Sequence, residues 1–257
     1  MSLLWIHAII WPCVNALVGI LAFEWCWHVT KPIREIDEAR DSKYPAFRRN
    51  DAKNWRRWKF YPGAMTFFVF RLFLAIFNLL LCYILTKIIC AGANIESGRP
   101  ITGCRCKAIR YLYLVQARIE MLAFGYRFKT RKLDFDYSEY LGPDYKETMK
   151  LPKKISTIVS NHSSWFDPLL LNNIFACGFV AKREVKTAPV GGVIAMALGS
   201  IFISRGGSPE ELQKIVDEID ERQRMIEDYG EYPPFIVFPE GGTSNGSCIL
   251  PFKRGAF

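Results

Sequence analysis

Histidine is scarce in this sequence. Only three of the 257 residues are histidine, and His162 is the only one after residue 28. The eight cysteines are scattered, and Cys104-x-Cys106 alone is not a spacing that binds zinc. The sequence therefore predicts no metal site. We expect the cysteines to be reduced, as in a domain that faces the cytosol or the mitochondrial matrix.

Charged residues are also sparse. They make up 23% of the chain, against 50% apolar residues, and this balance excludes an intrinsically disordered protein. Lysine and arginine number 34 and acidic residues 25, so the net charge is +9. The basic stretches flank long apolar ones, and no nucleic-acid-binding motif is present. We therefore expect a phospholipid membrane, and not nucleic acid, as the partner.

The amino terminus has no lysine or arginine before residue 31. This excludes a cleaved signal peptide, which needs a basic start. The 22 residues from Ser2 to Phe23 carry no formal charge. As a helix they would span about 33 Å, enough for the hydrocarbon core of a bilayer. We predict a retained membrane helix over 2–29, with four tryptophans in the aromatic belts of the interface: Trp5, Trp11, Trp25 and Trp27.

A second apolar stretch, Ala64 to Ala93, contains only two charged residues, Arg71 and Lys87. Both cations can reach toward lipid headgroups, so the stretch predicts a second apolar helix over 64–93. A basic loop, 31–63, joins the two predicted helices, and together they form a membrane region over residues 1–95.

The orientation of this region stays open. The loop 31–63 contains ten Lys and Arg, and nine more lie in 94–132. If both helices crossed the bilayer, these basic stretches would lie on opposite sides, against the positive-inside rule. One helix would then lie in the interface or re-enter. Within the loop, Trp55–Lys59 either rests on anionic headgroups or is an ordinary solvated segment.

From residue 96 onward, short β-branched apolar runs alternate with helical stretches, which predicts strands alternating with helices. The clearest helix starts where Ser208 can cap it and Pro209 suits its first turn. We predict an α/β fold for residues 96–257, a mixed sheet with flanking helices, preceded by the membrane region. The predicted strands are 155–159, 178–181, 201–203 and 235–238, and the predicted helices are 109–128, 169–175, 191–198 and 208–229.

Chemistry-bearing residues follow three of these strands. In the first segment, 161–168, His162 comes directly after a strand and Asp167 precedes a helix. A turn can bring the carboxylate to one imidazole nitrogen, which leaves the other nitrogen free to accept a proton. Such a pair needs no serine or cysteine nucleophile if it activates a hydroxyl of the substrate. The alternative is that Asp167 is only a helix cap or a polar contact.

The second and third segments suit anions. In 199–207, Arg205 precedes two glycines, an arrangement that offers a bidentate anion site with close backbone approach, or simply a surface turn. In 238–246, a buried strand is followed by Glu240 and a glycine-rich turn that can bind phosphate.

Together the three segments resemble the glycerolipid acyltransferase family, whose blocks read Asn-His-x4-Asp, Gly-x-Ile-Phe-Ile-x-Arg and Phe-Pro-Glu-Gly in this order. The resemblance covers roughly residues 155–257. It implies that His162 is the general base and Asp167 its orienting partner. It also implies a substrate-binding set in which Arg205 binds the acceptor phosphate: Asn161, Arg205, Glu240, Gly241, Gly242 and Thr243.

By this resemblance we expect an integral membrane enzyme of the endoplasmic reticulum or a mitochondrial membrane. It would transfer a fatty acyl group from acyl-CoA, its co-substrate, to a lysophospholipid or glycerol-phosphate lipid, without a further cofactor. The family often has an arginine where Thr243 stands, so a choline or ethanolamine lysophospholipid is favoured over lysophosphatidate. The alternative is a catalytically weak, lipid-binding subunit of a membrane complex.

The family continues past Phe257 into a block that completes its sheet. The chain is therefore expected to be either a fragment or a shortened relative. In the second case, another protein chain would cover the sheet edge that is left open after Phe257.

Overall fold

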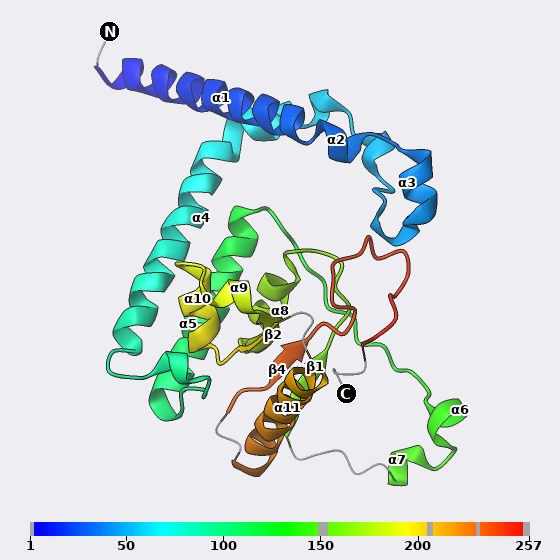
Figure 1. Ribbon diagram of the computed structural model, residues 1–257. Coiled ribbons are helices and arrows are strands. Elements are labelled where there is room, and N and C mark those ends of the chain that lie inside the picture. The colour runs from blue at the N-terminus through cyan, green and yellow to red at the C-terminus, as the bar shows by residue number, and fades with distance from the viewer. Residues whose placement is uncertain (1–2, 149–153, 205–207, 230–231, 254–257) are drawn as a thin grey trace.

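The computed structural model describes residues 3–148, 154–204, 208–229 and 232–253 (Figure 1). Two long helices, α1 (Leu3–Val29) and α4 (Tyr61–Ile89), precede the α/β part. Both are apolar and long enough to cross a membrane, over Ile10–Val29 and Tyr61–Ile89. Only 6% and 17% of the residues in the apolar stretches of the two helices are buried. The core helix of a soluble protein is instead buried over most of its length.

Helix α1 runs across the amino-terminal end of α4 (Figure 1). The two helices approach closely at Gly19, where a Cβ atom would lie 1.9 Å from the carbonyl oxygen of Ala64. Asn15 Nδ2 donates to the carbonyl of Met65 at 2.5 Å. Any residue larger than glycine at position 19 would therefore separate the two helices.

Glu24, the acidic residue within the apolar helix α1, is paired with a cation of the basic loop. Arg57 Nε donates to Glu24 Oε1 at 3.0 Å and the same guanidinium forms an ion pair with this carboxylate. The Tyr61 hydroxyl donates to Glu24 Oε1 at 2.5 Å. The basic loop thus returns to α1 and is structured. It contains short helical turns: α2 (Lys31–Arg34), α3 (Glu38–Lys43), η1 (Pro45–Phe47), η2 (Ala52–Asn54) and η3 (Arg57–Lys59).

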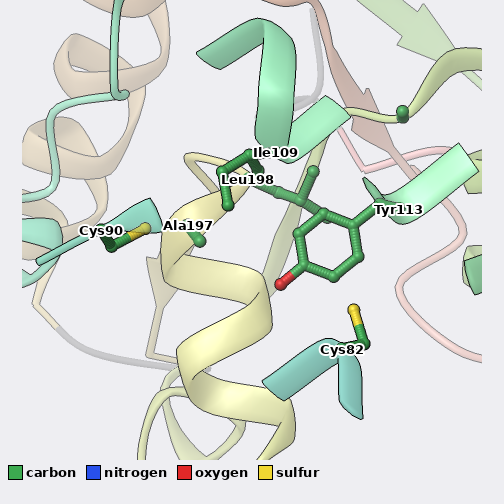
Figure 2. Close-up of a cluster of buried hydrophobic side chains, with 7 residues drawn as sticks. Cys82, Cys90, Ile109, Tyr113, Ala197 and Leu198 are labelled. Carbon is green, nitrogen blue, oxygen red and sulfur yellow. The ribbon is translucent and has the colours of Figure 1, made fainter. Parts of the chain in front are cut away.

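Helix α5 (Gly103–Ala123) packs between α4 and the α/β part. A buried cluster joins α4, α5 and the end of α10 (Figure 2), and consists of Cys82, Cys90, Ile109, Tyr113, Ala176, Ala197 and Leu198. Thr86 Oγ1 and the Tyr113 hydroxyl lie 2.7 Å apart within it. This cluster takes side chains from both sides of residue 95, and the domain division there stays a prediction.

The sheet has the strand order β1-β4-β2-β3. All pairs among the described strands are parallel, so this part of the sheet is parallel and not mixed as expected. The register places Val159 beside Val237, and Ala181 beside Phe202. The strands are β1 (Thr157–Val159), β2 (Gly178–Lys182), β3 (Ile201–Ile203) and β4 (Phe235–Val237). The α/β fold class is confirmed.

The remaining helices follow in the order of the chain, and α11 (Pro209–Tyr229) packs apolar side chains against residues of the strands. Ser208 and Glu211 form a reciprocal capping box, with distances of 3.0 and 3.4 Å. Ile219 and Ile226 of α11 are buried with Phe235. The other elements are η4 (Ile95–Ser97), α6 (Ser138–Leu141), α7 (Tyr145–Thr148), α8 (Asp167–Phe175), α9 (Arg183–Lys186) and α10 (Gly191–Ala197).

Candidate active site

The turn between β1 and α8 brings His162 and Asp167 together. His162 Nδ1 lies 2.8 Å from Asp167 Oδ2, and the two side chains are only 19% and 15% exposed. The same carboxylate oxygen accepts the backbone N–H groups of Ser163 at 2.7 Å and Ser164 at 2.8 Å. Three donors therefore fix the position of one oxygen atom.

This geometry determines which imidazole nitrogen is basic. A carboxylate can only accept hydrogen bonds, so Nδ1 of His162 carries the proton and Nε2 carries the free lone pair. No hydrogen bond to Nε2 is present within the residues that the structure describes. Nε2 can therefore take a proton from an incoming hydroxyl, while Asp167 stabilises the imidazolium that results.

The imidazole ring is also held by its face. It stacks on Phe238, with ring centres 4.3 Å apart and planes inclined by 20°. Phe238 is in turn stacked with Phe179, at 6.0 Å and 7°. Because Phe238 follows β4 and Phe179 lies in β2, the orientation of the catalytic candidate is coupled to the centre of the sheet.

Glu240 holds the backbone of His162. Its Oε1 accepts the N–H of His162 at 3.0 Å, and its Oε2 accepts the N–H of Leu250 at 3.2 Å. The N–H of Ser244 donates to the carbonyl of His162 at 2.8 Å. The third segment thus binds both backbone groups of His162, and the carboxylate of Glu240, only 6% exposed, is occupied by these contacts.

The other predicted substrate-binding residues surround this core loosely. Asn161 and Thr243 are exposed. A Cβ atom at Gly242 would meet nothing within 4 Å, so the space beside it is open. Gly241 has φ +67°, and a Cβ there would lie 2.9 Å from Lys253 Cε and 3.0 Å from Lys253 Nζ. The structure thus brings a lysine to the glycine-rich turn, a cation that the sequence reasoning had not assigned.

The predicted phosphate ligand Arg205 lies outside the described residues, as do Gly206 and Gly207. The strand before it, β3, pairs in parallel with β2. The carboxyl ends of β1, β4 and β3 therefore face the same edge of the sheet, where ligands of open α/β sheets bind. Arg205 follows one of these ends, and its contact with the acceptor stays a prediction.

Other chemistry near the site is limited. Within the described ranges, no three His, Cys, Asp or Glu side chains group in a way that could hold a metal ion. Burial raises the pKa of the Cys177 thiol to about 12, so this cysteine is a neutral thiol at pH 7 and a poor nucleophile. A hollow of about 300 Å³ lies elsewhere, where α1 meets the basic loop, and is lined by Glu24, Trp27, His28, Lys31, Arg34 and Arg57.

Comparison with known proteins finds acyltransferases. Residues 143–257 match the model of the Acyltransferase family. Lysophospholipid acyltransferase LPEAT1 of Arabidopsis thaliana is 36% identical over 106 residues, 41% of this chain and 27% of that protein. Lysophospholipid acyltransferase LPCAT4 of Xenopus tropicalis is 26% identical over 206 residues, 79% of this chain and 36% of that protein.

A third relative, lysophosphatidylcholine acyltransferase 1 of Danio rerio, is 38% identical over 96 residues, 37% of this chain and 18% of that protein. The chain therefore spans about a fifth to a third of the length of these curated relatives. No solved structure matches the chain significantly. The three segments with the His162–Asp167 pair lie wholly within residues 143–257, the range that matches the Acyltransferase family.

Proposed function

We propose that this chain transfers an acyl group from acyl-CoA to the free hydroxyl of a lysophospholipid at a membrane. The observation that carries the proposal is the contact of His162 Nδ1 with Asp167 at 2.8 Å, which leaves Nε2 as the base. The curated relatives are named lysophospholipid or lysophosphatidylcholine acyltransferases. The two long exposed apolar helices support an integral membrane protein, of the endoplasmic reticulum or a mitochondrial membrane.

The reaction needs one base. Nε2 of His162 takes the proton of the acceptor hydroxyl as its oxygen attacks the thioester carbonyl carbon. The C–S bond then breaks, and the departing sulfur of coenzyme A takes the proton back from the imidazolium. Asp167 lowers the free energy of the imidazolium, and the N–H groups of Ser163 and Ser164 keep this carboxylate in place.

We infer that the acceptor carries a phosphodiester headgroup such as choline or ethanolamine. Thr243 offers no charge at the turn, and Gly242 leaves open space beside it. Lys253, beside Gly241, and Arg205 supply the cations for a single phosphate. A lysophosphatidate, which carries a more highly charged phosphate monoester, would be the poorer acceptor.

The test is acyl transfer by the purified full chain in phosphatidylcholine nanodiscs, with labelled acyl-CoA and a panel of lysolipids. We expect labelled phosphatidylcholine or phosphatidylethanolamine to form. His162→Ala should lose roughly 10²- to 10⁴-fold in turnover, the usual contribution of a general base. If the wild-type chain forms no more product than His162→Ala but still binds lysolipid, the chain is the lipid-binding subunit and not the enzyme.

A further inference from the structure

We propose that an exposed surface beside the catalytic pair docks the active site onto the headgroup region of a phospholipid bilayer. This surface, the aromatic–basic surface, consists of Phe124, Tyr126, Arg127, Phe128, Lys129, Arg131, Lys132 and Trp165. The inference rests on the proposed function and extends it, because it states the side from which the lipid acceptor reaches His162.

The aromatic rings of this surface are organised around one residue, Phe166. Its ring centre lies 4.9 Å from that of Phe124, 4.6 Å from that of Tyr126 and 3.9 Å from that of Trp165. Phe166 is half-buried and immediately precedes Asp167. The cluster therefore has a fixed position relative to the catalytic pair.

The outer rings of the cluster are open to the surroundings. Trp165 is 72% exposed, Tyr126 48% and Phe124 47%. Exposed aromatic patches of this kind mark binding surfaces. Tryptophan and tyrosine, with an apolar ring and one polar group, favour the interface between lipid tails and water.

The charge of the same surface favours lipid over protein as the partner. The segment 124–133 contains four cations, Arg127, Lys129, Arg131 and Lys132, and no acid, and all four cations are exposed. Phe128 and Leu133 alternate with them and are 49% and 85% exposed. Alternating aromatic and basic side chains match a bilayer surface, where phosphates lie just above the acyl chains.

The aromatic–basic surface also adjoins the apolar helix α4. A Cβ atom at Gly125 would lie 2.9 Å from Arg71 Nη1, so the guanidinium of α4 sits directly beside the end of α5. Arg71 lies 5.2 Å from the ring centre of Phe67, which is 55% exposed. In space, the apolar side chains of α4 are thus followed by Arg71, then by the aromatic cluster, and then by Asp167. Apolar residues followed by a cation and aromatic rings are the order expected where lipid tails meet headgroups.

The first test compares acceptors. Trp165→Ala in nanodiscs should raise the KM for a long-chain lysophospholipid in the bilayer by about tenfold, an effect of the size expected for losing one buried aromatic ring. Its kcat/KM for a short-chain, water-soluble lysophospholipid should equal that of the wild type. Tyr140→Ala is the matched control, because Tyr140 is 71% exposed but lies in α6. Equal kinetics of Trp165→Ala and wild type in the bilayer, or equal losses with both acceptors, would overturn the proposal.

A second test does not depend on turnover. Tryptophan fluorescence of wild type and Trp165→Phe is compared in vesicles whose phospholipids are brominated near the headgroup end of the acyl chain. The fluorescence that wild type has in excess of Trp165→Phe comes from Trp165, and we expect the brominated lipids to quench it. The double variant Arg127→Gln, Lys129→Gln should show weaker quenching in vesicles that contain phosphatidylglycerol. If Trp165 is not quenched in any of the vesicles, the docking proposal is wrong. The aromatic–basic surface would then bind a protein partner instead. If no acceptor is acylated but Trp165 is quenched, only the proposed function fails.

Discussion

At the scale of single residues, the site is built by fixing every part of His162 except one nitrogen. Asp167 binds Nδ1, Phe238 covers the ring face, and Glu240 and Ser244 bind the backbone groups. Only Nε2 remains for chemistry. A base with a single available orientation reacts without a reorganisation cost, which is the main benefit of a prebuilt site.

Asp167→Asn should lower turnover less than His162→Ala does. The asparagine oxygen can replace Oδ2 and still accept from Ser163, Ser164 and Nδ1, so the ring keeps its orientation. The charge that stabilises the imidazolium is lost, and we expect a decrease of about 10- to 100-fold, smaller than the loss of the base. The check is kcat with the best lysophospholipid. A loss as large as that of His162→Ala would show that orientation is not retained.

Glu240→Gln should lower both stability and kcat. The side-chain oxygen of a glutamine can accept a hydrogen bond from the N–H of either His162 or Leu250. Its NH2 group then points at the remaining N–H, so that two donors face each other. A buried donor left unpaired costs about 1–3 kcal/mol, which corresponds to a melting temperature lower by roughly 2–10 °C. Thermal unfolding and steady-state kinetics measure both effects.

The same variant separates two roles of Glu240. If Glu240 positions His162, kcat should fall while the KM for the acceptor stays within about twofold of the wild-type value. A change in KM of that size is expected for a residue that does not contact the acceptor. A raised KM at unchanged kcat would instead place Glu240 in contact with the acceptor, as the family resemblance implies.

The sequence was informative about one half of this site and not the other. His162 and Asp167 belong to one short turn, so their pairing followed from local spacing. The bond from His162 to Glu240 spans 78 positions and depends on β1 and β4 being neighbours. Sequence order alone would place β1 beside β2, and a glutamate in a glycine-rich turn gives no sign that its partner is a backbone N–H.

At the scale of elements, α5 connects the apolar helix α4 to the sheet. Asn78 of α4 donates to the carbonyl of Gln116 at 3.1 Å and to Glu120 Oε1 at 3.2 Å. These are buried polar contacts between two helices, and they fix the register of α4 against α5. Burial raises the pKa of Glu120, although its bonds from Asn78 and Gln116 oppose this.

Glu120→Gln should therefore make the chain more stable at neutral pH. A raised folded-state pKa means that the folded protein binds more protons than the unfolded one, so the free energy of unfolding falls as pH rises from the usual glutamate range through the raised value. Glutamine removes this dependence and keeps an oxygen for Asn78. Melting temperatures of the two proteins should coincide near pH 4 and diverge toward pH 8.

Glu210→Gln is a control of opposite sign. The pKa of Glu210 is lowered, chiefly by a hydrogen bond with Ser208, so its contribution to stability is present at neutral pH and lost as pH falls. The variant should be less stable than the wild type near pH 7. Parallel pH profiles for Glu120→Gln and wild type would mean that folding does not raise the pKa of Glu120.

The ends of the helices show what hydropathy alone misses. The apolar stretch predicted a helix over 64–93, but α4 covers Tyr61–Ile89. Pro62 suits the first turn, and Gly92 has φ +74° just beyond the end. Similarly, α5 begins at Gly103 and not at residue 109, because its first turn is polar and lies outside the apolar pattern. Proline, glycine and polar residues mark these boundaries, and hydropathy alone does not show them.

At the scale of the whole molecule, three distant parts of the chain are joined by a few polar residues. Arg222 of α11 donates to the carbonyl of Gly199 at 2.8 Å and also to that of Gly98, and burial lowers its pKa. At the other end of α4, Asn245 Nδ2 donates to the carbonyls of Pro45 at 2.8 Å and Arg48 at 2.9 Å. Segments before and after α4 are therefore both attached to the α/β part.

Asn245→Ala should loosen the basic loop. It removes the two hydrogen bonds from Nδ2 to the loop, worth about 0.5–1.5 kcal/mol each, as well as two local bonds that Oδ1 accepts from Ser247. It leaves the bond from the Asn245 N–H to the carbonyl of Ala46. Trypsin should then cut within residues 31–59 about fivefold faster or more, measured by mass spectrometry of limited digests. Gln213→Ala, which removes an exposed side-chain bond to Asp217 within α11, should leave the rate unchanged. Equal rates for both variants would exclude Asn245 as the tether.

The long separation of His162 from Glu240 also sets the order of events during synthesis. The N–H of His162 cannot be bound until Glu240, 78 positions later, has left the ribosome. At a translation rate of ~5–20 residues per second, this delay is about 4–16 s. Both apolar helices have emerged by then, so they can pack or insert before the backbone of His162 is held in its final position.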